Sequence, residues 1–556
     1  MFVLDAYAAR SCPVKTHNAF HPGLIQPPTE PSPRFPGSAE FSARVLGALV
    51  APHHRTIVDC RALGDSPSSV QEETCLRALA EGADIIIGGL LPRDYAGHRS
   101  GRPDVLVRDR SPHGGYRPVL VKYQKLLDLR RDEAPFVYSL LDEPDARQEG
   151  TGFRYRWSVR TNNVLQLAHY WRMLEALGHA APGRRWAGIV GTDDVPDTGT
   201  VITWVDLDEP TLPPSPGEPL DPEPPLMSPL ARYDHEQRVR VEIAERAADC
   251  SPDEPPLLRP IVTRECGWCP WWTVCRPQLD DDDLSLRISK SPLDAHEIAV
   301  LRELGVTRVG DLAHADLDDL LPAYLPQVAH RPGGEDRLRL AQRRSLLLLD
   351  GIELDRTTKG PIQLPTADLE IDIDIETSRD ERIYLWGFWV QDADGGEGYY
   401  RHFSAFRELD AEAEAALACE ALGWLREFVQ GRDARVYHYS DYEVLRIERL
   451  AREHDRPVLS WARDFAHDRF VDLFAPVRQH FFGTSGLGLK AVARQGAGFT
   501  WRDDNPGGLN SMSWFDDAIR AESPAVRDRA RTRVLEYNED DVRATWHVRR
   551  WLRAQR

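Results

Sequence analysis

The segment EIDIDIETS, residues 370–378, alternates strictly between apolar and acidic side chains. Its three isoleucines are separated by four acids, Glu370, Asp372, Asp374 and Glu376, and this period of two predicts a β-strand. Such a strand carries all four carboxylates on one face, where like charges repel one another. We therefore expect a cation, or several hydrogen-bond donors, to lie opposite that face.

The composition is that of an ordinary soluble protein. The chain has 556 residues, enough for roughly three or four domains, and is 42% hydrophobic and 28% charged. It has no apolar run of membrane-spanning length and no signal-peptide order at its start, so we expect a cytoplasmic protein with no membrane partner. The net charge of −19 excludes a protein that coats nucleic acid by bulk attraction, but not a nucleic-acid enzyme with carboxylate metal sites.

The pattern of elements predicts an α/β chain with interruptions. Two proline-rich segments, 23–37 and 207–230, are typical of surface loops. In the amino-terminal half, strands are predicted at 84–91, 104–109, 116–124, 186–194 and 200–208, and helices at 164–177 and 233–250. The region 290–350 has helical spacing.

After about residue 361 the apolar period returns to two. Predicted strands at 370–376, 382–390 and 398–406 are followed by a helix at 410–429, a strand at 435–440 and a helix beginning at Asp441. Three strands followed by alternating helix and strand favour an α/β domain with a mixed sheet.

The segment RECGWCPWWTVC, residues 264–275, brings three cysteines within ten positions. Thiolates this close can converge on one metal ion or cluster, but a closed site needs a fourth ligand. We prefer Cys12 over the other candidates, which are Cys60, Cys75, Cys250 and Cys419. Spacing alone favours a zinc staple, and it leaves open three buried thiols beside tryptophans.

A cysteine near the amino terminus with a late C-x2-C-x5-C trio resembles the iron-sulfur staple of RecB-like nucleases, including the AddB and CRISPR-adaptation branches. The resemblance implies a PD-(D/E)xK restriction-endonuclease-like domain whose two ends are pinned by a [4Fe-4S] cluster. Its ligands would be Cys12, Cys266, Cys269 and Cys275.

Other parts of a RecB-like site lie between these cysteines. GRPDVLV contains Asp104, PVLVKYQ contains Lys122, and QLAHY contains Gln166 and Tyr170 one helical turn apart. The resemblance implies that Asp104 binds Mg²⁺, that Lys122 orients or deprotonates water, and that the other two contact nucleic acid.

This amino-terminal site departs from the family pattern. The position two before Lys122 is Leu120 instead of a carboxylate, and the upstream helix offers Glu40, His53 and His54 without a clear ligand. We interpret the site as degenerate but DNA-binding. The alternative is that Asp104 and Lys122 form an ordinary surface pair.

The segment LRELGVTRVGDLA, residues 301–313, predicts two helices joined by a glycine-containing turn. Helix-hairpin-helix modules use such turns to bind a DNA phosphate, although a plain helical hairpin is equally compatible. Six arginines favour a phosphate-facing surface here: Arg302, Arg308, Arg337, Arg339, Arg343 and Arg344.

Three ordered motifs in the carboxy-terminal region resemble those of DnaQ-like 3′-5′ exonucleases, which have an RNase H-like fold. Asp374-Ile-Glu376-Thr matches the opening D-x-E-T motif. The segment 436–450 resembles the second motif, with Glu443 in place of the usual aspartate and Asp441 as a rival ligand. EYNEDDV supplies Tyr537 and Asp541 as the Y-x3-D of the third motif.

The exonuclease resemblance implies two Mg²⁺ or Mn²⁺ ions, with a tyrosine hydroxyl near the attacking water. The ligands would be Asp374, Glu376, Glu443 and Asp541, and Lys490 in SGLGLK would contact a phosphate.

The order of parts resembles a family of predicted RecB-type nucleases from bacteria. We predict a RecB-like domain at 1–285, a helical hairpin linker at 286–360 and an RNase H-like exonuclease domain at 361–556. The resemblance implies a metal-dependent DNA nuclease of repair or defence that cuts single-stranded ends, with a helicase or other repair or defence proteins as partners. Two alternatives stay open: a catalytically silent DNA-binding scaffold and a zinc-stapled interaction protein.

Overall fold

The structure is a computed structural model that describes residues 1–28, 37–50, 55–111, 114–129, 134–195, 198–214, 226–287, 293–391, 398–504 and 507–556. The chain divides into two compact units, residues 1–342 and 343–556. The middle of each proline-rich segment lies outside the described residues. No helix in the described ranges is long and apolar enough to cross a membrane.

An eight-stranded mixed sheet organises the first unit, in the order β1-β2-β5-β6-β11-β12-β8-β9. Strands β2, β5 and β6 pair antiparallel in succession, and β11 then pairs parallel to β6. The strands are β1 Ile57–Asp59, β2 Ile85–Ile87, β5 Val105–Arg108, β6 Tyr116–Val121, β8 Phe136–Leu140, β9 Gln148–Gly150, β11 Trp186–Val195 and β12 Gly199–Asp206. The predicted strands and helices of this half are thus present.

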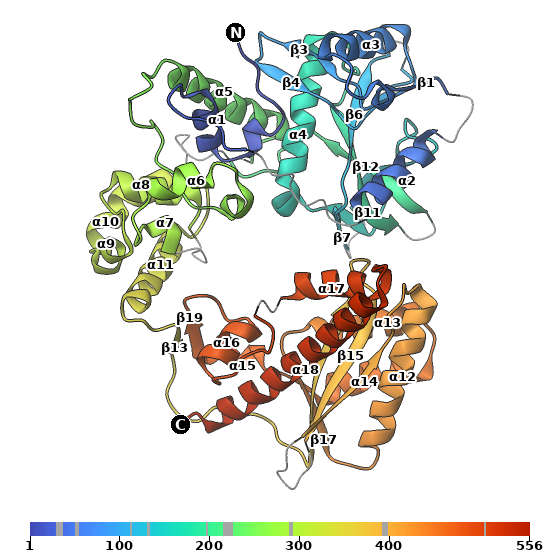
Figure 1. The fold of residues 1–556 in the computed structure, drawn as a ribbon, viewed down its shortest axis with the longest axis vertical. Coiled ribbons are helices and arrows are strands. Elements are labelled where there is room, and N and C mark those ends of the chain that lie inside the picture. The colour runs from blue at the N-terminus through green and yellow to red at the C-terminus, as the bar shows by residue number, and fades with distance from the viewer. Residues whose placement is uncertain are drawn as a thin grey trace. The chain divides into compact units, whose positions relative to one another are not determined.

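Helices cover both faces of this sheet, which explains why the central strands are largely apolar. On one face α3 (Ser68–Glu81), α4 (Trp157–Ala176) and α5 (Pro229–Ala248) contribute to a core that includes Leu120. Figure 1 shows α4 alongside the sheet. On the other face α2 (Ser38–Val50) packs through Phe41, Val45 and Leu49.

Short elements complete the amino-terminal region. They are η1 Ala8–Arg10, α1 Pro13–Phe20, η2 Cys60–Leu63, β3 Leu91–Asp94, β4 Arg99–Gly101, β7 Leu127–Leu129 and β10 Phe153–Tyr155. The next segment is helical, and the prediction of helices covers its part from residue 290 on. It contains η3 Arg264–Trp268, α6 Trp272–Cys275, η4 Arg276–Gln278, α7 Leu284–Arg287, α8 Ala295–Glu303, α9 Val309–His314, α10 Leu317–Tyr324, η5 Leu325–Val328 and α11 Gly334–Leu349.

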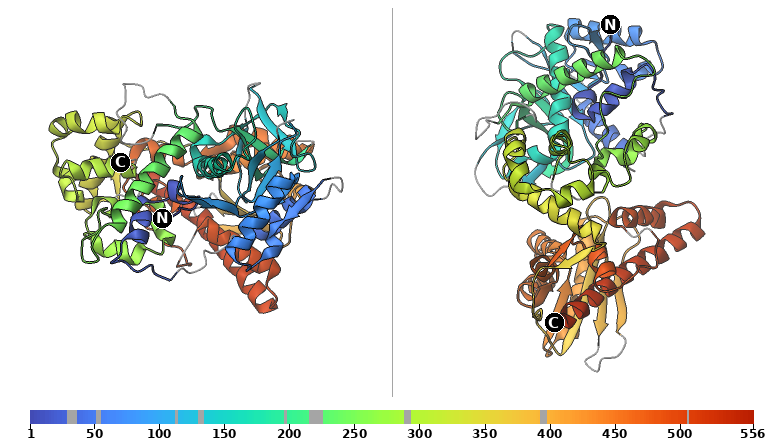
Figure 2. Two further views of the ribbon diagram at one scale, coloured as in Figure 1. Left: turned by 90° about the horizontal axis from the view of Figure 1, so that it is seen from above. Right: turned by 90° about the vertical axis from the view of Figure 1, so that its left-hand side faces the viewer.

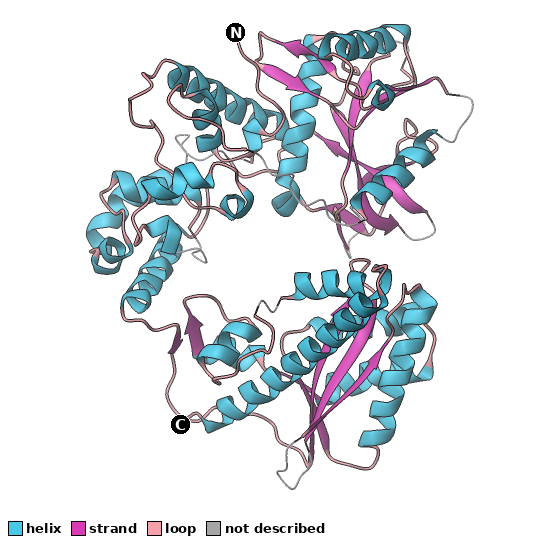
Figure 3. Ribbon diagram, in the orientation of Figure 1, coloured by secondary structure: helices cyan, strands magenta, loops and turns pink. Residues whose placement is uncertain are grey.

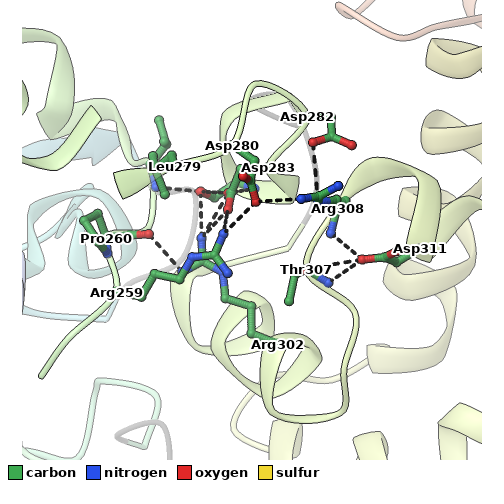
Figure 4. A network of polar contacts seen from close by, with 12 residues as sticks. Arg259, Pro260, Leu279, Asp280, Asp282, Asp283, Arg302, Thr307, Arg308 and Asp311 are labelled. Atoms are coloured by element: carbon green, nitrogen blue, oxygen red, sulfur yellow. Dashed lines mark hydrogen bonds and ion pairs between the residues drawn. The ribbon is translucent and has the colours of Figure 1, made fainter. Parts of the chain in front are cut away.

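The turn between α8 and α9 is held by contacts within the chain (Figure 4). The Asp311 carboxylate accepts hydrogen bonds from the backbone N–H groups of Thr307 at 3.0 Å and Arg308 at 2.8 Å. Arg302 donates to both carboxylate oxygens of the buried Asp283, each at 3.0 Å. The last two N–H groups of the turn are therefore already engaged by Asp311, and the others bond to carbonyl groups of α8.

The prediction of a phosphate-facing arginine surface is wrong for two of its residues. Arg302 neutralises Asp283, and Arg337 forms an ion pair of 2.7 Å with Glu297, another fully buried carboxylate. Removing a carboxylate from water is costly unless a cation compensates it, so these guanidinium groups stabilise the helical segment.

A five-stranded mixed sheet forms the centre of the second unit, in the order β16-β15-β14-β17-β18. Strands β14, β15 and β16 are antiparallel neighbours, whereas β17 is parallel to β14 and β18 to β17. The strands are β14 Leu369–Thr377, β15 Ile383–Gln391, β16 Tyr399–Ser404, β17 Ala434–His438 and β18 Phe470–Asp472. A separate pair joins β13 (Leu354–Arg356) to β19 (Phe481–Gly483). The predicted mixed α/β architecture is confirmed in this unit.

Helices also lie on both faces of this second sheet (Figure 3). The isoleucines of β14 pack against α12 (Ala411–Val429), α13 (Tyr442–Glu453) and α14 (Pro457–Arg469). The opposite face is covered by α18 (Pro524–Ala554), whose amino-terminal part lies beside α17 (Gly508–Arg520), as Figure 2 shows. Two short helices complete the unit, α15 Phe474–His480 and α16 Leu489–Gln495.

The acidic face of β14 is matched to one face of α18. Every fourth residue of a helix advances about 6 Å, and every second residue of a strand advances about 6.6 Å. Arg549 binds both oxygens of the fully buried Asp372, at 2.7 and 3.1 Å, and Arg553 binds Glu370 at 2.6 and 2.8 Å. Two of the four acids are therefore neutralised by arginines.

Candidate functional site

The other two acids of β14 meet an acid of α18. Oxygen atoms of Asp374, Glu376 and Asp541 lie within 4.8 Å of one another, and no other trio of His, Cys, Asp or Glu ligand atoms in the described ranges is this close. Asp374 and Glu376 share a face because they are two residues apart on a strand. Asp541 belongs to the α18 face that also carries Arg549.

Asp374 is held in place by a chain of two side chains. Asn538 donates from Nδ2 to Asp374 Oδ2 at 2.7 Å, and the Tyr400 hydroxyl donates to Asn538 Oδ1 at 2.7 Å. Gly387 lies opposite Asp374 on β15, and a Cβ atom there would come within 1.8 Å of Asn538 Oδ1. The absence of a side chain at residue 387 thus makes room for this positioning amide.

Glu376 is held by a second pair of residues. The hydroxyl of the fully buried Ser511, on α17, donates to Glu376 Oε2 at 2.7 Å. The Ser511 oxygen also lies 3.0 Å from the Tyr384 hydroxyl. One carboxylate oxygen of Glu376 is therefore oriented by the protein.

Asp541 contacts a tryptophan and a lysine. The Trp501 indole N–H donates to Asp541 Oδ1 at 2.6 Å, and Lys490 Nζ lies 3.5 Å from Asp541 Oδ2. Lys490 also donates to the Tyr537 hydroxyl at 2.8 Å. The lysine predicted to contact a phosphate thus lies at the acidic group itself, and it is half-buried.

Burial and mutual repulsion make the carboxylates of this group hard to ionise. Burial raises the pKa of Asp374 well above its usual range, and the charges of Asp541 and Glu376 raise it further. Burial and the neighbouring Asp541 raise the pKa of Glu376 to about 8. The pKa of Asp541 is raised by burial, while Lys490 and Trp501 oppose the change. Three converging carboxylates with only one nearby cation among the described residues, Lys490, fit a divalent cation such as Mg²⁺ or Mn²⁺.

Glu443 approaches the same group from α13. It is buried, its charge raises the pKa values of Asp374 and Glu376, and its Oε2 forms no hydrogen bond within the described residues. Burial also raises the pKa of Glu443, opposed by the neighbouring His438. Its rival Asp441 is exposed at the amino-terminal cap of α13, so Glu443 has the better position for a fourth ligand.

Residues 372–553 match the RNase_H superfamily. This part of the chain is an RNase H-like domain. It contains the whole acidic group, and the predicted RNase H-like fold is confirmed there. No curated protein and no solved structure matches the chain.

The supporting donors of the RNase H-like domain were not predicted from the sequence. Ser511, Asn538 and Trp501 lie outside the D-x-E-T and second motifs, and serine, asparagine and tryptophan have many ordinary structural uses. Asn538 alone had a usable signal, because it falls three residues before Asp541 on the same helix.

In the first unit, Asp104 and Lys122 lie at the ends of neighbouring strands. Asp104 precedes β5 and accepts a hydrogen bond at 2.8 Å from the backbone N–H of Val121, next to Lys122. Continuing the strand register places Asp104 opposite Leu120. Burial raises the pKa of Asp104 and lowers that of Lys122, and the attraction between the two opposes both shifts.

The α4 residues of the QxxxY motif lie at the same site. Gln166 donates to the Tyr170 hydroxyl at 3.1 Å, both are buried, and the Asp104 charge acts on Tyr170. Arg10 also acts on Lys122 and Tyr170, and no sequence motif had singled it out. The structure thus brings Asp104, Lys122, Gln166 and Tyr170 together.

Among the described residues, neither Glu40 nor the residue at position 120 completes a metal site there. Glu40 is exposed, and Leu120 is fully buried in the hydrophobic core. His53 and His54 lie outside the described residues.

The four predicted cysteine ligands line one small pocket, together with Trp271 and Trp272 among others. Cys12 is the N-cap residue of α1. The Glu265 carboxylate accepts a hydrogen bond from the Cys12 backbone N–H at 3.0 Å and forms an ion pair with Lys15, so it fixes the position of Cys12. The other three cysteines that line the pocket are Cys266, Cys269 and Cys275.

Hydrogen bonds reach two of these sulfurs. The Asn18 amide donates to Cys275 Sγ at 3.7 Å, and the Thr263 backbone N–H donates to Cys266 Sγ at 3.4 Å. Burial raises the pKa of Cys275 to about 11. Cys60 and Cys75, which were rival candidates for the fourth ligand, belong to the hydrophobic core of the sheet instead. Four thiols around one pocket are the donor set of an iron-sulfur cluster, although no three of their sulfur atoms converge within 4.8 Å as the oxygens of the acidic group do.

Proposed function

We propose that the protein is a metal-dependent nuclease that hydrolyses phosphodiester bonds of DNA at single-stranded ends. The observation that carries the proposal is the buried group Asp374, Glu376 and Asp541 on an RNase H-like sheet. Each of these carboxylates is oriented by its own hydrogen-bond donor. A protein that only bound DNA would have no need to hold buried acids against their mutual repulsion.

The chemistry of these side chains indicates a role for each in hydrolysis. Two divalent ions held by Asp374, Glu376, Asp541 and Glu443 would activate a water molecule and stabilise the leaving 3′ oxygen. The Tyr537 hydroxyl, which accepts a hydrogen bond from Lys490, would orient the attacking water. The half-buried ammonium of Lys490 is placed to contact a phosphate oxygen.

We further propose 3′-5′ exonuclease polarity. Its support is the resemblance of the D-x-E-T and Y-x3-D motifs to DnaQ-like enzymes, together with the position of Tyr537 beside Asp541. Degradation of DNA labelled at its 5′ end should then give a ladder of shortened products, whereas a label at the 3′ end should be released as a mononucleotide.

For the first unit we propose a RecB-like nuclease fold that binds DNA and carries a [4Fe-4S] cluster. Its support is the succession of β2, β5 and β6, the α4 crossover and the parallel β11, together with the pocket of Cys12, Cys266, Cys269 and Cys275. The cluster would tie the amino-terminal segment to residues 266–275. A helicase or another repair or defence protein would supply the single-stranded ends.

Replacing Asp374 by Asn tests the nuclease proposal directly. We expect Mn²⁺-dependent degradation of end-labelled single-stranded DNA to fall by about a thousandfold or more, because a metal ligand is lost. The control is Asp433→Asn, which removes an exposed carboxylate beside β17 and should leave the rate unchanged.

Full activity of Asp374→Asn would contradict the assignment. Binding of DNA by the unaltered protein without any cleavage in Mn²⁺ would instead favour a catalytically silent scaffold.

A further inference from the structure

The metal site that the RecB resemblance implies in the first unit does not fit the residues that the structure describes there. Asp104 would need a second carboxylate opposite it, and that place is taken by Leu120, which is fully buried in the hydrophobic core. Glu40 on α2 is exposed. A single carboxylate holds Mg²⁺ weakly.

Cations outnumber acids at this site. Lys122 follows β6, and its ammonium has no hydrogen bond or ion pair with any residue that the structure describes. Arg10, at the end of η1, stacks 4.0 Å from the Tyr7 ring and donates to the Ala6 carbonyl, and among the described side chains it has no carboxylate partner. The charges that act on Lys122 are those of Asp104 and Arg10.

We infer that Lys122 and Arg10 form a metal-independent binding site for a phosphate group of single-stranded DNA. Lys122 lies within the influence of one carboxylate, Asp104, and of a second cation, Arg10, and one oxygen of that carboxylate already accepts the Val121 N–H. An anion between the cations would relieve the cost of burying Lys122, since charge-assisted hydrogen bonds to phosphate are strong.

The buried Gln166 and Tyr170 supply neutral polar groups beside this site. Gln166 Oε1 is buried and has no hydrogen-bond partner in the described part of the chain. The inference rests on the proposed function in one respect, that it takes DNA as the ligand.

A phosphate site and a metal site predict opposite effects of Asp104→Asn on DNA binding. A phosphate site loses a repulsive charge, so the variant should bind a fluorescent single-stranded oligonucleotide about threefold more tightly in EDTA. A metal site would lose its ligand and bind more weakly in Mg²⁺. Weaker or unchanged binding of Asp104→Asn in EDTA would overturn the inference.

Removing either cation should have the reverse effect. Lys122→Ala and Arg10→Ala should each weaken binding about tenfold in EDTA, and should lower the slope of log Kd against log salt by about 0.7. Arg238→Ala removes one positive charge from the exposed side of α5 and is the matched control. Variants that bind like the control would overturn the inference.

All binding measurements use the full-length chain with Asp374→Asn, so that cleavage does not consume the probe. Cleavage is measured separately, in Mn²⁺, with Asp374 intact. An inactive RNase H-like site would therefore leave the binding test unaffected, and an unaltered affinity of Lys122→Ala would leave the nuclease assignment standing.

Discussion

Ser511 shows how one residue outside the acidic group can control it. Its hydroxyl donates to Glu376, and replacing it by Ala removes only an oxygen atom from a fully buried position. We expect Ser511→Ala to keep the fold but to lower the affinity for Mn²⁺ by about tenfold or more, as is usual when a residue that orients a metal ligand is lost. Calorimetric titration of Mn²⁺ checks this. The control is Ser460→Ala on α14, which should bind Mn²⁺ as tightly as the unaltered chain.

Glu376 also gives the site a pH dependence. Because its pKa rises to about 8 in the folded protein, the protonated form stabilises the fold. This contribution is complete below the unfolded pKa of about 4.3 and is lost as the pH rises through about 8.

In EDTA the second unit should therefore become less stable between pH 5 and pH 8. Mn²⁺ binds the ionised carboxylates, so its stabilising effect should be larger at pH 8 than at pH 6, by about 4 °C or more in Tm. Thermal scans with EDTA and with Mn²⁺ measure both effects. Glu376→Gln should reduce the change of Tm with pH in EDTA. If Tm changed with pH as much in that variant as in the unaltered chain, Glu376 would not be the cause of the pH dependence.

The face of α18 that packs on β14 contributes both to the stability of the fold and to the acidic site. Arg549→Ala would leave Asp372 buried without its cation, and we expect a loss of about 3–5 kcal/mol in the free energy of unfolding. Urea unfolding of the second unit measures this.

Adding Asp372→Asn to Arg549→Ala should recover part of the loss, since the uncompensated charge is then gone. If the double variant were as unstable as the sum of the two single variants, the two residues would not be coupled.

Local sequence patterns predicted the elements of the RNase H-like domain well, because strand alternation and helix spacing depend on nearby residues. The resemblance to exonuclease motifs singled out Asp374, Glu376 and Asp541, and strand spacing puts the first two on one face. Local patterns could not distinguish the two acids of β14 that arginines neutralise from the two that belong to the acidic group. Arg549 and Arg553 neutralise Glu370 and Asp372 from about 180 residues away, and only the packing of α18 on the sheet shows it.

The same limit applies to the whole chain. The division at residue 342 falls inside α11, where a continuous helical pattern gives no sign of a boundary. In contrast, Cys12 is preferred from the sequence as partner of the late cysteines, and the structure places all four in one pocket across more than 250 residues of sequence.

That long closure would give the proposed cluster a stabilising role confined to one unit. A cluster that ties residue 12 to residues 266–275 stabilises the folded first unit, because its thiolates cannot be held together in the unfolded chain. Anaerobically purified protein should contain about four iron and four labile sulfide per chain, and Cys269→Ser should lose them.

Calorimetry should show two unfolding transitions, of which Cys269→Ser lowers only the one that belongs to residues 1–342. Cys250→Ser, at the end of α5, is the matched control and should keep both the iron and the transition. One zinc ion per chain without sulfide would replace the cluster by a zinc staple. A lowering of both transitions would instead show that the two units unfold together, because a ligand lost from one unit can destabilise the other only if their unfolding is coupled.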